Sequence, residues 1–441
     1  MRCRTGVWGL GAAALIMALS LWGPGVAFAQ SYDPVTQTLL PSDTERQAFD
    51  RGANVSVLQR PRPDYDAKGI HLGGFLVYPK LTSGVQFNDN IYAAQSFVRS
   101  DALFTVEPEV DIRSTWSRNS LSAYVRASQD IYSRFSVEDS TSVAVGGSGR
   151  LDFGDSTLTA DLSYNDSVLP RSAPNNGFIA KHPIPYDTAD YSLELAHTFN
   201  RLRLTARADY EVFQFQNGVT SAGTQVLEQD ENRGVATLTG NAEYAISPAI
   251  AVIVTGAYNK RDYELNPPAV PYTRNSSGFV VGAGVDFDLT HFARGEIQLA
   301  YMDQTYESHL FKTIAGLSAK GQIEMFPTEV LTVTLAGVRT VADSGIINSA
   351  GFLTTDGELQ VDYELLRNLI LTAKSTVGGD HYYGVSRQDQ HVSAGLSASW
   401  LLTRRVGMTF AYAFTNQHSS GADRGPSFDD NRVSVSTVLQ F

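Results

Sequence analysis

The chain has 441 residues, a formal net charge of −12 and a single cysteine, Cys3. The acidic balance disfavours nucleic-acid binding, because phosphate contacts need clustered lysine and arginine side chains. One cysteine cannot form an intrachain disulfide or a cysteine-based metal site, so the sequence excludes both.

The N-terminus has the three parts of a secretory signal peptide, which we assign to residues 1–29. Two arginines among the first four residues form a basic region, and residues 10–21 form an apolar core. Alanines at 27 and 29 form an A-x-A cleavage site, so we expect the mature chain to begin at Gln30. A membrane anchor is the alternative, but the apolar core is too short to span a bilayer comfortably.

Residues 30–71 form a polar stretch that precedes the regular part of the sequence. Four prolines interrupt this stretch, and no hydrophobic period is sustained in it. The composition favours a disordered N-terminal tail. The alternative is a strap that packs in the mouth of the following domain or docks a partner protein.

From residue 72 onward, apolar and polar side chains alternate. Residues 104–116 show the pattern clearly: Phe104 and Val110 share an apolar face, whereas Glu107 and Glu109 share an ionic one. A period of two is that of a β-strand. No window of about twenty apolar residues follows residue 30, which excludes a transmembrane helix. The apolar face therefore contacts either lipid, as in a membrane barrel, or a second sheet, as in a soluble sandwich.

The predicted connections alternate between short and long, as in outer-membrane barrels. The short links are expected at 117–120, 154–156, 200–201, 247–249, 290–292, 327–329, 366–368 and 402–404. The long links include 166–187, 216–233, 264–277, 378–389 and 415–429. The sequence thus predicts an all-β protein, with residues 72–441 forming a transmembrane antiparallel up-and-down β-barrel. About eighteen strands are expected, and sixteen remain possible because the pattern is weakest at 142–167 and 312–342.

Aromatic residues recur on the apolar face beside the short links. This predicted aromatic girdle consists of Trp116, Phe153, Phe199, Tyr244, Phe287, Tyr363 and Trp400. Barrels place such girdles at the membrane interfaces. The chain ends in an amphipathic segment with a terminal Phe441, which resembles the signal recognised by the barrel assembly machinery.

The ionic face of the predicted strands would line a lumen. Candidates for this face are Lys80, Glu107, Glu109, Asp111, Arg113, Arg126, Asp209, Glu211, Asp286, Asp288, Arg294, Glu296, Asp356, Glu358 and Asp362. Most of these charges are expected to form cross-strand ion pairs that keep the wall rigid. Because carboxylates outnumber basic groups, a weak preference for cations follows.

The sequence offers no constellation for catalysis. His391 shares a predicted inward face with Ser393, but no third member of a triad is evident. No H-E-x-x-H motif or histidine cluster is present, so we assign no catalytic residue, metal site or cofactor. Residues 88–90 and 429–430 could hold Ca²⁺, although turn roles explain them better.

Several short motifs resemble those of the outer-membrane β-barrel porin type 2 family, which is often encoded beside exopolysaccharide genes. They are the segment from Arg60 to Phe75, Asn88-Asp89-Asn90-Ile91-Tyr92, Arg294-Gly295-Glu296 with Tyr301, Asn368-Leu369, and Arg387 with Asp389. The resemblance covers about residues 55–441. It implies an integral protein of the Gram-negative outer membrane and a role in exopolysaccharide export or secretion.

Three functions therefore remain open at the level of sequence. The first is a pore for a hydrophilic solute, the second a closed structural or assembly barrel, and the third, least favoured, an outer-membrane enzyme. Both termini and residues 30–71 are expected in the periplasm. The expected partners are outer-membrane lipid, lipopolysaccharide and the barrel assembly machinery, with periplasmic polysaccharide-export components implied by the resemblance.

Overall fold

The computed structural model describes residues 52–173, 180–267, 272–346 and 348–441. The predicted signal peptide, its cleavage site and residues 30–51 lie outside this described part. Within it, no helix has both the length and the apolar character needed to cross a membrane.

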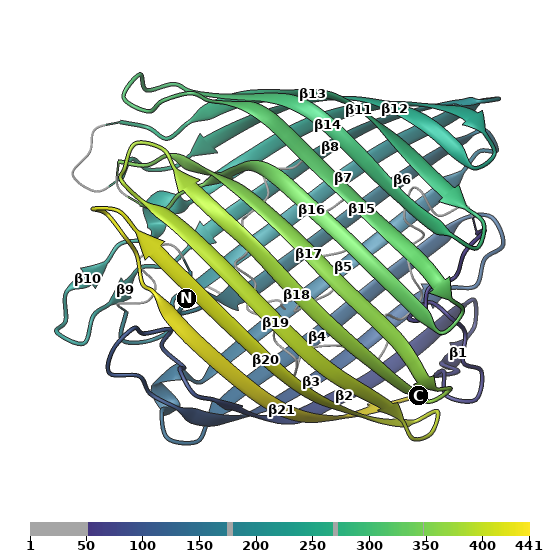
Figure 1. Ribbon diagram of the computed structural model, residues 1–441, viewed down its shortest axis with the longest axis horizontal. Helices are drawn as coiled ribbons and strands as arrows, with labels where there is room; N and C mark the ends of the chain where they lie inside the picture. Colours follow the sequence, from purple (N-terminus) through teal and green to yellow (C-terminus); the bar gives the residue numbers. More distant parts are fainter. Residues whose placement is uncertain (1–51, 174–179, 268–271, 347) are drawn as a thin grey trace.

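Eighteen long strands form one closed antiparallel barrel, which confirms the predicted fold class and resolves the strand number (Figure 1). Their bounds are β2 (Phe75–Asn88), β3 (Asp101–Ser114), β4 (Ser120–Tyr132), β5 (Ser140–Asp152), β6 (Ser156–Val168), β7 (Pro185–Phe199), β8 (Leu202–Phe215), β11 (Arg233–Ser247), β12 (Ile250–Tyr263), β13 (Ser276–Leu289), β14 (Ala293–Tyr306), β15 (Ile314–Thr328), β16 (Leu331–Asp343), β17 (Gly351–Leu366), β18 (Leu369–Tyr382), β19 (Gln388–Leu401), β20 (Val406–Ser420) and β21 (Phe428–Gln440). Each strand pairs with its neighbour in sequence, and β21 pairs with β2 to close the sheet.

Burial in this barrel is inverted relative to a soluble protein. In β3, the apolar side chain of Phe104 is 43% exposed, whereas the ionic side chain of Glu109 is 3% exposed. The cross-strand register sets Glu109 opposite both Lys80 and Arg126 on the inner face. Apolar side chains on the outside and charged ones inside are the pattern of a barrel in lipid.

The connections separate the two ends of the barrel. At one end, the turn end, the strands are joined by two to five residues, and at the other, the loop end, by five to seventeen. Two predicted long links are shorter than expected: β18 and β19 are joined by residues 383–387, and β20 and β21 by 421–427. The polar residues there extend the strands, since Asp380 pairs with Asp389 and Asn416 with Asp429.

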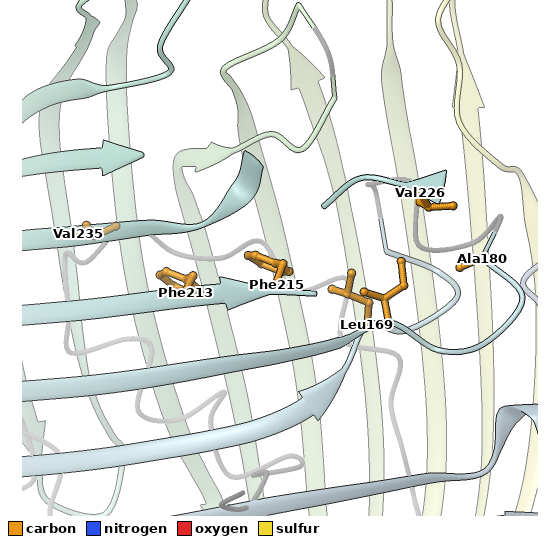
Figure 2. Packing of buried hydrophobic residues seen from close by; sticks show 7 residues of the cluster. Leu169, Ala180, Phe213, Phe215, Val226 and Val235 are labelled. Carbon is orange, nitrogen blue, oxygen red and sulfur yellow. The ribbon is translucent and has the colours of Figure 1, made fainter. Parts of the chain in front are cut away.

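Apolar residues pack inside the loop end. Phe213 and Phe215 of β8 lie with Val235 of β11 against Leu169 and Val226, which belong to loops (Figure 2). Val226 lies in β10 (Gln225–Val226), which pairs with β9 (Gly218–Val219) within the longest loop. Two short 3₁₀ helices, η1 (Ser136–Glu138) and η3 (Gln229–Glu231), also lie in loops. The inner face is therefore ionic at mid-height but partly apolar where loops dock.

The expectation of a disordered tail is wrong for residues 52–71. The strand β1 (Ile70–Leu72) pairs with the start of β2, with Leu72 opposite Phe75. Residues 53–69, which we call the strap, contact the inner wall at the turn end. Composition alone favoured disorder because the contacts that order the strap are made with strands hundreds of residues away.

Candidate pore and its two ends

The middle of the lumen is lined by ion pairs between neighbouring strands. Glu109 accepts hydrogen bonds from two cations: its carboxylate lies 2.8 Å from Lys80 Nζ and 2.7 Å from Arg126 Nε. The carboxylate of Glu107 lies 3.6 Å from the same Arg126 nitrogen. These groups come from β2, β3 and β4, so the pairs connect adjacent strands and stiffen the wall.

Further ion pairs recur around the barrel, within one strand, between neighbouring strands or across an intervening strand. They are Arg207–Asp209 at 2.7 Å, Lys320–Glu296 at 2.9 Å, Arg294–Glu324 at 2.7 Å, Lys374–Glu358 at 3.1 Å and His391–Asp356 at 2.6 Å. Other inner carboxylates accept hydrogen bonds from hydroxyl groups: Asp190 from Ser163, and Asp362 from Thr372. Acidic groups therefore exceed the cations that pair with them along this wall.

The fifteen residues proposed for the lumen from sequence all lie on the inner face of their strands. The residues of this set that are at least nine-tenths buried are Glu107, Glu109, Arg126, Asp286, Asp288, Arg294 and Asp362. The others, which are partly accessible, are Lys80, Asp111, Arg113, Asp209, Glu211, Glu296, Asp356 and Glu358. Asp190 of β7 and Glu211 of β8 are direct cross-strand partners, an acid–acid pair that the sequence analysis did not predict. The alternation of polar and apolar residues along both strands would have placed the two side chains on the inner face.

The seven residues of the predicted girdle lie close to the turn end, on the outer face. Trp116, Phe153, Phe199, Tyr244, Tyr363 and Trp400 are exposed, and Phe287 is half-buried. An exposed aromatic ring beside a short turn fits the level of lipid headgroups, where the tryptophans and tyrosines of the set contact hydrocarbon with the ring and water with their polar group.

The strap begins its contacts at β13. The backbone nitrogen of Ala53 donates to Asp288 Oδ2 at 3.1 Å, and that of Val57 donates to Thr332 Oγ1 of β16 at 2.9 Å. The Val57 side chain is fully buried in an apolar cluster with three inward residues of the wall. These are Ile370, Leu401 and Val438, from β18, β19 and β21.

Charged contacts then hold the strap to β17 and to the C-terminus. The buried Arg62 donates to Glu364 Oε2 at 2.9 Å, and Arg60 donates to the same oxygen at 3.4 Å. Farther along, the backbone nitrogen of Gly69 donates to the carbonyl oxygen of Phe441 at 3.2 Å. The strap thus lines the inner rim of the turn end from β13 to β21.

At the loop end, two buried arginines tie loops together. Arg171 donates to both carboxylate oxygens of Glu138, at 2.9 and 2.6 Å, and so joins the loop between β6 and β7 to η1. Arg274 donates to Asp230 of η3 at 3.1 Å and to the carbonyl oxygen of Ile346 at 3.4 Å. Sequence reasoning missed both arginines, because loop residues have no period that reveals their direction.

Comparison with known families identifies the fold. The family described as "Putative beta-barrel porin 2" matches residues 62–441. The chain belongs to this family. The porin is thus an integral protein of the outer membrane, as the lipid-facing barrel requires.

Several solved structures are similar to the porin. The siderophore receptor PirA from Pseudomonas aeruginosa is 9% identical, with 83% of this chain and 80% of that chain covered and a TM-score of 0.45. OccAB3 from Acinetobacter baumannii is 10% identical, with 84% and 100% covered and a TM-score of 0.45. OccK2 (OpdF) from Pseudomonas aeruginosa, in complex with glucuronate, is 12% identical, with 83% and 98% covered and a TM-score of 0.44. No curated protein matches the chain.

The histidine considered for catalysis in the porin has an acidic partner that sequence reasoning missed. His391 Nε2 lies 2.6 Å from Asp356 Oδ1 of β17. The hydroxyl of Ser393, however, is hydrogen-bonded to that of Thr376. A triad requires the histidine to bond the nucleophile as well as the acid, and the Ser393 contact does not supply that bond. Across the described ranges, no three histidine, cysteine or acidic residues form a group that could hold a metal.

Proposed function

We propose that this porin forms a water-filled pore that passes a hydrophilic solute across the outer membrane. The observation that carries the proposal is the ionic inner face, illustrated by Glu109 between Lys80 and Arg126. Removing paired charges from water costs several kcal/mol per ion in effective terms. Many such pairs around one lumen are therefore stable only where water or a polar plug solvates them. An eighteen-stranded barrel is also wide enough for an aqueous channel.

We infer that the turn end faces the periplasm and the loop end faces the outside. The support is the length asymmetry of the connections, since outer-membrane barrels keep short turns on the periplasmic side. The strap and Phe441 would then both lie at the periplasmic mouth, where the strap is in position to narrow the entrance.

The solute is proposed to be an exopolysaccharide or its oligosaccharide units. The family resemblance supports this assignment, and two inward tyrosines supply suitable chemistry. Tyr78 lies 5.5 Å from the Arg113 guanidinium, and Tyr124 lies 5.9 Å from that of Arg126. An aromatic ring beside a cation offers an apolar face for a sugar ring and donors for its hydroxyl groups. The excess of inner carboxylates adds a weak preference for cations over anions.

Solute flux into proteoliposomes tests the assignment. Vesicles containing the porin should take up neutral oligosaccharides faster than protein-free vesicles, with uptake falling as chain length rises. Replacement of Tyr78 and Tyr124 by alanine should lower oligosaccharide uptake more than uptake of a small ion. If no oligosaccharide enters although small ions do, the pore proposal stands and the polysaccharide assignment is wrong.

A closed structural barrel is the second candidate, favoured by the strap and by the loops that Arg171 and Arg274 tie together. This candidate predicts that neither ions nor sugars cross, even when residues 53–69 are deleted.

A further inference from the structure

The loop-end part of β16 separates from the barrel wall. Pairing between β15 and β16 ends at Ala319 and Arg339, although β15 continues to pair with β14. Pairing between β16 and β17, in contrast, continues to Asp343 and Gly351. We call the two strand ends Val341–Asp343 and Gly351–Leu353 the tip. In the tip, the end of β16 keeps one neighbour, β17, where a strand in the wall keeps two.

The tip also reverses the sidedness of its residues. Along β16, Leu335 lies on the outer face and is 43% exposed, and alternation would put Val341 and Asp343 on that same face. Val341 is nevertheless 5% exposed and packs in one cluster with Met302 and Tyr306, which come from β14. Met302 alternates with the exposed Tyr301 and so faces inward. The tip therefore leans into the mouth of the barrel, with its nominally outer face against the inner wall.

Asp343 connects the tip to β11 and β12 over the inner face of the strands between them. Its carboxylate lies 2.9 Å from Arg233 Nε of β11 and also pairs with Arg261 of β12. Three strands, β13–β15, separate β12 from β16 in the sheet. At the usual strand spacing the four steps would span roughly 19 Å along the wall. A direct ion pair over that interval requires the tip to lie across the inner face of the intervening strands, as its packing against Met302 and Tyr306 of β14 shows.

Close packing holds the tip in this position. A side chain on Gly351 would place its Cβ 2.4 Å from the Tyr306 hydroxyl oxygen and 2.9 Å from the Ala342 carbonyl oxygen, so only glycine fits there. The side chains of Arg233, Arg261 and Asp343 retain 6%, 2% and 9% exposure, which leaves little room beside them. Phe213 closes the other side of Arg233, with its ring 4.2 Å from the guanidinium carbon.

We propose that Asp343, together with Arg233 and Arg261, forms the constriction of the pore and determines its charge selectivity. The inference rests on the proposed pore function. Two guanidinium groups share the Asp343 carboxylate, and the carboxyl groups of Glu211 and Glu231 lie close enough to act electrostatically on the same arginines. The charges of this cluster are therefore nearly balanced, so loss of one charge changes its sign. Charged side chains at the narrowest point set the barrier for ions of the opposite and the same sign.

Reversal potentials across a salt gradient test the inference in planar bilayers. The Asp343→Asn variant keeps the shape of the side chain and removes its charge, so selectivity should shift toward anions. The double variant Arg233→Gln with Arg261→Gln should shift selectivity toward cations. Single-channel conductance should rise in both variants, because the link that holds the tip over the inner face of the barrel is weakened. If these residues had only a structural role, substitution of the carboxylate and of the arginines would not shift the charge selectivity in opposite directions.

Asp262 supplies the matched control. It neighbours Arg261 on β12 but lies on the opposite face, where it pairs with Lys260 at 2.7 Å with both side chains about half exposed. Asp262→Asn removes one carboxylate at the same height and should leave the reversal potential unchanged. Heat-dependent gel migration would verify that each variant is folded, and the single Arg261→Gln variant replaces the double variant if the latter misfolds.

The outcomes separate this inference from the proposed function. A wild-type protein that conducts with the same selectivity as both variants would overturn the constriction and leave the pore intact. A silent wild type with conducting variants would support the constriction and show that the resting pore is closed. Silence of every variant would overturn both proposals.

Discussion

Single residues on the outer and inner faces of one strand should differ in tolerance to substitution. Val110 of β3 is 37% exposed on the lipid-facing side, and its neighbour Glu109 is buried in ion pairs on the inner side. Val110→Arg places a charge in hydrocarbon, which costs roughly 2–4 kcal/mol near the midplane. Unfolding by urea in lipid vesicles, followed by tryptophan fluorescence, should show this loss of stability.

Arg203 is the matched inner position, because it is exposed on the lumen face of β8. Arg203→Gln should change the free energy of unfolding little. An equal loss in Val110→Arg and Arg203→Gln would contradict the assignment of faces. Alternation alone would suggest Glu109→Gln as an equally good control. It is less suitable, because Glu109 pairs with Lys80 and Arg126, and its substitution leaves these two buried cations without their carboxylate.

The residue scale is also where sequence reasoning succeeds most. A strict period of two places Glu107, Asp111 and Arg113 on one face of their strand, and this placement does not depend on tertiary contacts. The period cannot report which charges meet, so the pairing of His391 with Asp356 was missed. It also fails where a strand leaves the sheet, as at Asp343, because alternation assumes a neighbour on both sides.

Among the elements, the longest loop contains a buried acid pair that should respond to pH. Burial, reinforced by the neighbouring Glu231, raises the pKa of Glu228 from its ordinary 4.5 to about 10. The packed loop therefore holds a proton that the opened loop releases. Its stability is greatest below about pH 4.5, falls as pH rises, and is lost near pH 10. Hydrogen exchange of residues 216–232 should accelerate as pH rises, beyond the intrinsic increase of the amides.

Glu228→Gln is the control for that pH response. A neutral amide cannot ionise, so the extra acceleration should be smaller in this variant, and what remains belongs to Glu231, whose pKa is also raised by burial. The same extra acceleration in wild type and Glu228→Gln would assign the response to another group.

The strap should be released by loss of its one fully buried cation. Arg62 pairs with Glu364 and has a side chain with no exposed surface, whereas Asp64 is 89% exposed and lies 3.7 Å from Arg404. A cysteine at Val57, in a chain whose only natural cysteine is Cys3, should be protected from maleimide. Arg62→Ala should expose it, because breaking one partner of a buried ion pair costs about 3–5 kcal/mol.

Asp64→Ala serves as the comparison for the strap, since its contact is solvent-screened and worth little. The cysteine at 57 could react equally slowly in the parent protein, in Arg62→Ala and in Asp64→Ala. That result would mean that the strap is held by its apolar contacts alone. The sequence offered a strap only as the alternative to a disordered tail, because Val57 and its partner Thr332 lie 275 residues apart. Nothing in the local composition of residues 53–69 indicates these partners.

For the whole molecule, the orientation in the membrane is the first testable property. Ser221 is exposed in the loop between β8 and β11, and Arg118 is exposed in the turn between β3 and β4. With the turn end in the periplasm, a cysteine at 221 should react with an impermeant maleimide on intact cells. A cysteine at 118 should react only after the outer membrane is permeabilised. The reverse pattern would invert the topology and place the strap outside.

The overall architecture was predictable because every strand alternates apolar and polar residues and every second connection is short. The exact loop lengths were not, since polar pairs such as Asn416 with Asp429 continue the sheet beyond the apolar belt. The state of the lumen was not predictable either. It depends on the strap, the loops and the tip, which contact residues far away in sequence.

Single-channel recording in planar bilayers tests the central proposal, an aqueous pore, most directly. Mature porin should insert as discrete current steps with a mild preference for cations in a salt gradient, and deletion of residues 53–69 should enlarge the steps. An inserted, folded protein that passes no current, with or without the strap, would contradict the pore and favour the closed structural barrel.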